Sequence, residues 1–194
     1  MKVIDHLAQA DKPVISFEVV PPPRGGNIAD LEKVVEQLAV FKPLFIDVTS
    51  HAAEMVDVSV SGEMSRRVVR KRPGTLGICA LIQRKYGIDA VPHVLCHGLT
   101  SEETEDFLLE LHYCGIENVL ALRGDDHGYH KPLTNGRTVN SYAQDLVWQI
   151  KSLNEGRYGD GNLLDGAPLD FCDGVAGYPE KHKGALNLKI DIEF

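Results

Sequence analysis

The sequence has few cysteines, and no two of them lie close together in the chain. Its four cysteines, Cys79, Cys96, Cys114 and Cys172, stand singly with no Cys-x-x-Cys pair. This pattern is typical of reduced thiols and argues against a disulfide framework or a zinc knuckle. No apolar run approaches the roughly 18 residues that a membrane span requires, and the N-terminus lacks the basic and then apolar layout of a secretory signal. We therefore expect a cytoplasmic protein without a membrane partner.

The sequence also lacks an excess of basic residues. Lys and Arg number 20 against 28 Asp and Glu, which gives a formal net charge of -8. A negatively charged protein repels the phosphate backbone of DNA and RNA, so nucleic acid is not an expected partner. Hydrophobic residues make up 43% of the 194, which is ordinary for a globular domain and sufficient for one sizeable core.

Strand-like and helix-like segments alternate along the chain. Short apolar runs rich in β-branched residues predict strands, and apolar residues three and four apart predict helices. Proline or glycine ends several of them, as at Pro21, Gly87 and Gly115. The predicted strands are 13–20, 44–49, 88–96, 116–124 and 173–177, and the predicted helices are 27–41, one within 50–72, 74–87, 100–114 and 141–156.

This alternation implies right-handed crossovers and a parallel sheet. Two architectures fit it, the open doubly wound sheet and the closed (β/α)8 TIM barrel. A doubly wound nucleotide-binding protein usually has a glycine-rich fingerprint after its first strand, whereas the first strand here runs into three prolines at 21–23. No Walker sequence is present either. Spacing alone does not separate the two architectures.

Two predicted strands carry charged side chains at positions suited to chemistry. Glu18 lies between Phe17 and Val19 in the first strand. A carboxyl in so apolar a setting is pushed toward its neutral form, which suits a general acid, and the alternative is an ion pair with Lys or Arg. Leu-Arg-Gly-Asp at 122–125 ends the fourth strand, where parallel α/β proteins bind ligands, although the same residues also suit a turn.

Histidines are the remaining candidates for a metal site. His93 and His97 are two alternations apart on a strand, roughly 13 Å, which is too far for both to bind one ion directly. His127 and His130 lie in a polar, glycine-containing loop, where solvated side chains are the simpler interpretation. A zinc-dependent hydrolase is therefore disfavoured, and no metal is predicted.

Six short motifs, in their order and spacing, resemble those of the methylenetetrahydrofolate reductase family. They are SFEVVPPPR at 16–24, a Val-Thr strand exit at 48–49, PHVLC at 92–96, Leu-Arg-Gly-Asp at 122–125, a Tyr-Ala helix start at 142–143 and AGYPEKH at 176–182. Each motif is short, but together they extend from Ser16 to His182. The resemblance implies one domain, residues 1–194, of the TIM-barrel type.

The resemblance further implies a flavin-dependent enzyme that reduces 5,10-methylenetetrahydrofolate to 5-methyltetrahydrofolate. FAD is the implied cofactor; NADH or NADPH reduces it, and the folate then accepts the hydride. Glu18 matches the family's acid, which opens the five-membered ring of the folate. Asp125 matches an aspartate beside the flavin and the folate, where its charge tunes the reaction. The implied catalytic residues are therefore Glu18 and Asp125, and the full-length protein is expected to be a homo-oligomer.

Other positions match cofactor contacts of the family. Arg123 suits a diphosphate because its guanidinium binds two oxygens at once. Many relatives have Val-Thr-Tyr-Gly-Ala where this chain has Val-Thr-Ser-His-Ala, so Ser50 replaces an aromatic contact and His51 is new. The implied cofactor-binding residues are Thr49, Ser50, His51, Ala52, His93, Arg123, Gly124, Asp125, Tyr142, Ala143, Tyr178, His182, Ala185 and Asp191.

The family's barrel has more strand–helix units than this sequence provides. The chain holds roughly the first four and a half, whereas a barrel of this type closes with eight in about 250 residues. The remaining units bring further folate and flavin contacts in the family. We therefore expect a truncated, open barrel that aggregates or pairs with a second chain and is inactive by itself. The alternative is a non-catalytic flavin- or folate-binding or regulatory fragment.

Overall fold

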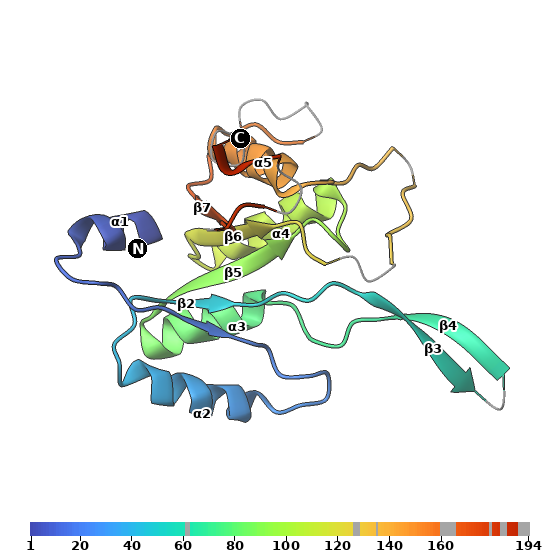
Figure 1. Ribbon diagram of the computed structural model, residues 1–194, viewed down its shortest axis with the longest axis horizontal. Helices are drawn as coiled ribbons and strands as arrows, with labels where there is room; N and C mark the ends of the chain where they lie inside the picture. Colours follow the sequence, from blue (N-terminus) through green and yellow to red (C-terminus); the bar gives the residue numbers. More distant parts are fainter. Residues whose placement is uncertain are drawn as a thin grey trace.

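A five-stranded parallel sheet forms the centre of the molecule (Figure 1). The computed structural model describes residues 1–60, 63–125, 129–134, 136–159, 166–178, 180–182 and 186–189. The strands follow one another across the sheet in chain order, and every neighbouring pair is parallel. They are β1 (Phe17–Val19), β2 (Phe45–Val48), β5 (Asp89–Leu95), β6 (Asn118–Leu122) and β7 (Cys172–Val175).

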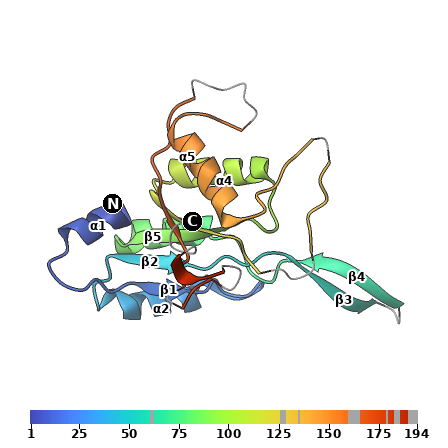
Figure 2. The same cartoon turned by 45° about the horizontal axis from the view of Figure 1, so that its top comes forward.

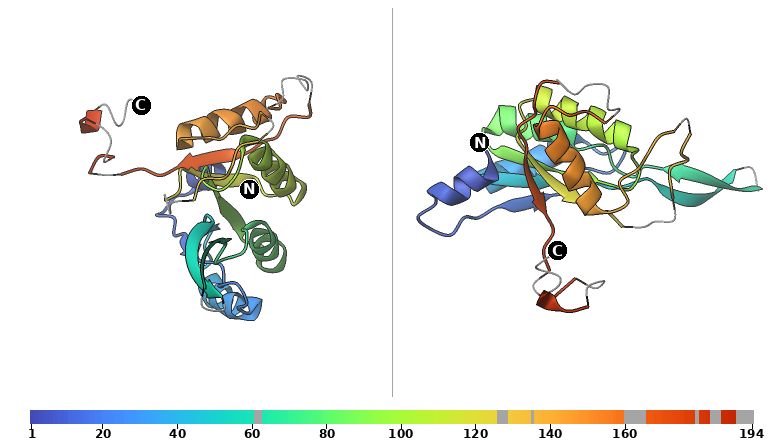
Figure 3. Two further views of the ribbon diagram at one scale, coloured as in Figure 1. Left: turned by 90° about the vertical axis from the view of Figure 1, so that its right-hand side faces the viewer. Right: turned by 90° about the horizontal axis from the view of Figure 1, so that it is seen from above.

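The helices between these strands pack on one face of the sheet (Figure 3, left). Strand residues with fully buried side chains, such as Ile46, Ala90 and Val119, point into this helical layer. The helices are α2 (Ile28–Ala39), α3 (Leu76–Leu81) with the π-helical turn η1 (Ile82–Tyr86), α4 (Ser101–Tyr113) and α5 (Ala143–Asn154). Strands in chain order with helices on a single face favour the barrel architecture, because a doubly wound sheet reverses its strand order and carries helices on both faces.

The sheet is open. β1 pairs with β2 and β7 pairs with β6, and the two outer strands do not pair with each other in the described part of the chain. Exposed apolar residues lie beside this edge, since Val20, directly after β1, and Val34 on α2 are 46% and 44% exposed. The expected open edge is therefore present at β1.

The helix ends confirm the predicted capping chemistry. Asn27 accepts a hydrogen bond from the Ala29 backbone N–H at 3.0 Å, so it caps α2. Thr100 and Glu103 form the predicted capping box at α4, each side chain accepting from the other's backbone N–H. Gly87 follows η1 and Gly115 follows α4, with φ of +65° and +75°, which glycine adopts without strain.

The helix predicted within 50–72 is wrong. This segment forms an antiparallel hairpin of β3 (Glu54–Val60) and β4 (Glu63–Val69), which extends away from the sheet (Figures 1 and 2). The sequence alternates apolar and polar residues from Val56 to Val60, which is the period of a strand. A cross-strand ion pair joins Arg66 to Asp57, with Nε 3.1 Å from Oδ1.

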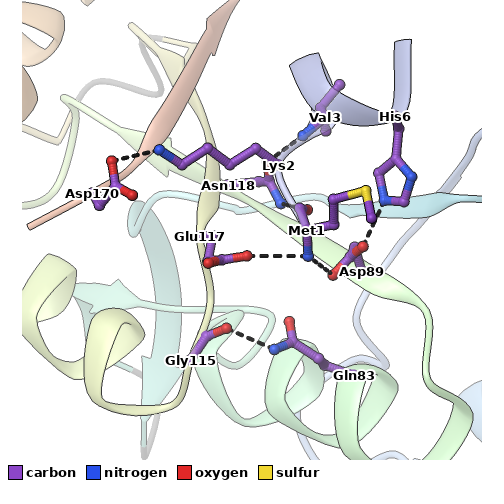
Figure 4. Close-up of polar contacts among 10 residues, drawn as sticks. All are labelled: Met1, Lys2, Val3, His6, Gln83, Asp89, Gly115, Glu117, Asn118 and Asp170. Atoms are coloured by element: carbon purple, nitrogen blue, oxygen red, sulfur yellow. Dashed lines mark hydrogen bonds and ion pairs between the residues drawn. The ribbon is translucent and has the colours of Figure 1, made fainter. Parts of the chain in front are cut away.

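A short helix at the N-terminus, α1 (Val3–Gln9), was not predicted. It lies at the N-terminal ends of the strands, and contacts from distant residues fix it there (Figure 4). The side chain of Asn118, the first residue of β6, accepts from the Val3 N–H at 2.7 Å and donates to the Met1 carbonyl at 2.9 Å. Asp89, the first residue of β5, accepts from the terminal ammonium at 2.7 Å and lies 2.6 Å from the His6 imidazole.

A seven-residue helix held by such long-range contacts has no periodic signal of its own, because it is shorter than the window over which helical periodicity can be read. Among the helices that the structure describes, none is both long and apolar enough to cross a membrane.

Candidate functional site

The candidate site lies at the carboxyl ends of the parallel strands. The strand exits stay in register for one residue beyond the strands themselves, as Thr49 N–H donates to the Val19 carbonyl at 3.0 Å and Cys96 N–H to the Leu122 carbonyl at 3.0 Å. The polar residues that follow β2, β5 and β6 are thereby held at a common edge. This is the edge at which parallel α/β proteins bind their ligands.

Three ionisable side chains share the face of the sheet that the helices leave open. Glu18 and Asp47 are register partners on β1 and β2, so their side chains leave the sheet on the same side. His93 lies on β5, two residues beyond Val91, the partner of Asp47, and therefore also on this side. Its Nε2 atom is 3.4 Å from Oε2 of Glu18.

The expected burial of Glu18 is wrong for this chain. The Glu18 side chain is 57% exposed, whereas that of His93 is 8% exposed. The apolar neighbour Val19 in the sequence is 4% exposed and points into the helical core, because side chains alternate across a strand. β1 is also an outer strand, so no further strand covers Glu18 on that side among the described residues.

Asp47 is a carboxyl that the fold shields from solvent, and it was not among the predicted site residues. Burial, together with the neighbouring Glu18 carboxylate, raises the pKa of Asp47 to about 6. Burial also lowers the pKa of His93, with His51 acting in the same direction and Glu18 opposing them. The available signal was strand alternation, since Asp47 is two residues before Thr49 and shares its face.

Two buried polar atoms at this edge have no hydrogen-bond partner among the described residues. They are Oγ1 of Thr49 and Nε2 of His93. Continuing the register of β2 and β5 by one residue beyond Val48 and Pro92 places Thr49 opposite His93. Buried polar groups in native proteins nearly always have a partner. The pair therefore fits a ligand that offers hydrogen-bonding atoms.

The Leu-Arg-Gly-Asp motif is brought next to the start of α5. The Arg123 guanidinium carbon lies 5.6 Å from the centre of the Tyr142 ring, a cation–π arrangement. The backbone carbonyl of Asp125 is 3.1 Å from Nδ1 of His97. Gly124 has φ of +83°, the left-handed region that disfavours a side chain. Ala143 begins α5, whose capping residue is Tyr142.

Other predicted site residues lie in the segments that follow β2 and β7. Ser50, His51 and Ala52 lie between β2 and the β3–β4 hairpin. Tyr178 and His182 follow β7, with ring centres 5.3 Å apart in an edge-on arrangement. Ala185 and Asp191 lie outside the described residues, as does His127.

Thiols and histidines form no metal site in the part of the chain that is described. No group of three or more His, Cys, Asp or Glu there is arranged to hold an ion. His97 and His130 approach each other with ring centres 6.3 Å apart. All four cysteines are free thiols, with Cys79 and Cys96 buried. Burial raises the pKa of Cys96 to about 11, which keeps this thiol protonated at neutral pH.

Known proteins resemble this chain over nearly its whole length. A family model described as methylenetetrahydrofolate reductase matches residues 2–194. Methylenetetrahydrofolate reductase 1 of Schizosaccharomyces pombe is 31% identical over 207 residues, covering 98% of this chain and 29% of that protein.

A bacterial and a plant protein give similar matches. The 5,10-methylenetetrahydrofolate reductase of Escherichia coli is 30% identical over 179 residues, covering 92% of this chain and 48% of that protein. A rice (Oryza sativa) protein, probable methylenetetrahydrofolate reductase (NADH), is 30% identical over 193 residues, covering 96% of this chain and 27% of that protein. The chain thus spans between 27% and 48% of the length of these relatives.

Proposed function

The chain belongs to the methylenetetrahydrofolate reductase family, and from this premise we propose that the full-length gene product reduces 5,10-methylenetetrahydrofolate to 5-methyltetrahydrofolate. The observation that carries the proposal is the open face on which Glu18 lies 3.4 Å from His93. An acid on an open face, beside buried polar atoms that lack a partner among the described residues, suits a substrate that must receive a proton while it is held.

We propose that the complete fold is a (β/α)8 barrel. The support is the chain-order sheet with its helices on one face, and the open edge at β1 with exposed apolar residues beside it. In such a barrel the face that carries Glu18 and His93 becomes the interior, and the strand exits form the mouth. The predicted polar residues would then all lie at or just below that mouth.

Glu18 is proposed to be the acid. A folate lying over the open face excludes water from Glu18, and loss of water favours the protonated, proton-donating form of a carboxyl. Protonation of the ring nitrogen turns that amine into a leaving group. Asp125 is exposed at the exit of β6, and its negative charge is proposed to stabilise the positive charge that develops on the folate.

The residues present fit a flavin. Thr49 Oγ1 and His93 Nε2 are buried polar atoms that lack a partner among the described residues, and flavin rings carry both donors and acceptors. Arg123 is exposed beside Tyr142 and offers two N–H groups to a diphosphate. When bound, FAD supplies the hydride, and NADH or NADPH is the proposed source of that hydride.

For the 194-residue chain taken alone we propose no turnover. Glu18 is 57% exposed there, so solvent competes for the position in which the substrate must be held and protonated. Binding of flavin or folate without reduction is the second candidate function for this chain, and the same open face favours it.

Stopped-flow absorbance on the anaerobic, FAD-loaded full-length gene product tests the proposal. NADH or NADPH is expected to bleach the visible flavin absorbance, and methylenetetrahydrofolate is expected to restore it with formation of 5-methyltetrahydrofolate. A reduced flavin that stays bleached in the presence of the folate contradicts the proposed reaction. The same measurement on the 194-residue chain separates binding from turnover.

A further inference from the structure

Asp47 is a shielded carboxyl placed directly beside the proposed acid. Glu18 and Asp47 are Cα register partners on adjacent parallel strands, and such strands lie about 4.8 Å apart. Both side chains are on the open face of the sheet. The proposed function uses Glu18 and leaves Asp47 without a role.

We propose that Asp47 is a positioning residue that shares one proton with Glu18 and returns it to Glu18 after each proton donation. The inference rests on the proposed function. It adds to that function the proton supply that the acid needs in every cycle.

The groups around Asp47 favour a shared proton. Glu18 acts on Asp47 from β1, and Asp47 in turn acts on the thiol of Cys79 on α3. His93 on β5 shares the open face, and His51, in the segment after β2, acts on His93. The buried thiol of Cys79 is neutral because burial raises its pKa. Burial likewise lowers the pKa of His93, so its imidazole is neutral at neutral pH. The neighbour that acts on Asp47 by its charge is therefore Glu18.

Two neighbouring carboxylates repel each other, so the first proton is held more firmly than by either group alone. Burial adds to this effect and raises the pKa of Asp47 to about 6. The exposed member of the pair, Glu18, is the one that can reach a substrate. The shielded member, Asp47, holds a proton up to about pH 6 while the site is open to water.

The proton balance of one cycle is as follows. Protonated Glu18 gives its proton to the ring nitrogen of the folate. The bond between that nitrogen and the bridging carbon breaks, and its electron pair stays on the nitrogen. The hydride that derives from the nicotinamide donor adds to the bridging carbon. Glu18 is left as a carboxylate, Asp47 passes its proton to it, and Asp47 regains a proton from a hydronium ion or buffer acid of the solvent at the open face, so that each cycle consumes one solvent proton.

Asp47→Asn in the full-length gene product tests the inference, because an amide of similar shape removes the charge and the exchangeable acid. In the variant, the rate of the folate half-reaction is expected to begin its fall at high pH at a lower pH than in the wild type. Above that pH, the rate of the variant is lower than that of the wild type by roughly tenfold for each pH unit of this displacement. Reduction of the flavin by the nicotinamide is expected to be unchanged. An unchanged pH profile, or an equal loss in both half-reactions, overturns the inference.

Asp89→Asn is the matched control. Asp89 is also a partly buried carboxyl on the sheet, with a 19% exposed side chain, but it lies at the opposite end and binds the N-terminal ammonium at 2.7 Å. This variant is expected to lower stability and to leave the pH profile of the folate half-reaction in place. In a Glu18→Gln background, Asp47→Asn is expected to have no further effect on the folate step, because the pair acts as a unit; an additive loss overturns the inference.

A folding measurement keeps the inference testable apart from catalysis. Since the pKa of Asp47 is raised in the folded state, its contribution to stability is complete below about pH 4 and is lost as the pH rises through about 6. The melting temperature of Asp47→Asn is therefore expected to rise relative to the wild type over that range, and a constant difference overturns the shared proton. If wild-type protein shows no folate half-reaction, the proposed function fails, and the folding measurement still decides whether the pair exists. Because Glu18 contributes to the raised pKa of Asp47, the pH dependence is expected to become smaller in a Glu18→Gln background, and an unchanged dependence there overturns the pair.

Discussion

Nε2 of the buried His93 lies 3.4 Å from Oε2 of the exposed Glu18. Because burial lowers the pKa of His93, this contact at neutral pH joins a neutral ring to a carboxyl group and is not a permanent ion pair. The contact is not a hydrogen bond either, because Nε2 of His93 has no hydrogen-bond partner among the described residues. Nε2 of His93 therefore stays available to a ligand that lies on the open face beside the proposed acid.

Glu18→Gln is expected to separate the two half-reactions of the full-length gene product. Glutamine keeps the size of the side chain but has no acidic proton, so reduction of methylenetetrahydrofolate should fall by roughly 10²- to 10⁴-fold. Reduction of the flavin by the nicotinamide needs no acid and should be retained. Single-turnover stopped-flow absorbance measures both steps, and a variant with wild-type rates in both removes Glu18 from the role of acid.

Thr100→Ala is expected to destabilise α4. Thr100 Oγ1 accepts from the Glu103 N–H at 3.2 Å, and alanine leaves this N–H without its capping partner. The expected loss in free energy of unfolding is about 1 kcal/mol. Urea unfolding followed by circular dichroism measures it. Thr100→Ser retains the hydroxyl and should restore most of the stability, and equal losses in both variants would assign the effect to packing of the Thr methyl group.

These local signals explain which parts of the fold the sequence predicted. The caps at Asn27 and Thr100 depend on residues two or three positions away, so the chain itself displays them. The β3–β4 hairpin was predicted to be a helix, although Val56 to Val60 alternate as a strand does.

The site depended on contacts that sequence neighbours do not reveal. Glu18 was expected to be buried from its neighbours Phe17 and Val19, but adjacent residues on a strand face opposite sides. Its real neighbours, Asp47 and His93, come from other strands and are set by register. The position of β1 at the edge of the sheet decides its exposure, and the sequence pattern of β1 contains no sign of that position.

Asn118→Ala is expected to release α1 from the N-terminal ends of the strands. Asn118 is buried, with 2% of its surface exposed. Its side chain makes one hydrogen bond to Val3 and one to Met1 (Figure 4). Loss of both should lower the free energy of unfolding by about 1–3 kcal/mol, at roughly 0.5–1.5 kcal/mol for each bond.

Hydrogen exchange with mass spectrometry locates the effect of Asn118→Ala. Exchange should accelerate at residues 3–9 and remain slow in α4, because the hydrogen bonds of α4 do not involve Asn118. Uniform acceleration across the chain would show instead that α1 is not an independent unit.

Gly124→Ala tests whether the strand exit at the Leu-Arg-Gly-Asp motif is part of a binding site. At φ of +83° a side chain costs about 1–2 kcal/mol, while the added Cβ would meet Leu95 Cδ1 at 3.5 Å and His97 Cβ at 3.6 Å, which are ordinary contacts. The penalty therefore falls on the backbone that carries Arg123 and Asp125. Gly136→Ala is the matched control, because φ is +75° there and nothing lies within 4 Å of the added Cβ. Both variants should lose similar stability in thermal unfolding, but only Gly124→Ala should weaken FAD binding, measured by titration of flavin fluorescence. Equal FAD affinity in the two variants would place the cofactor away from this exit.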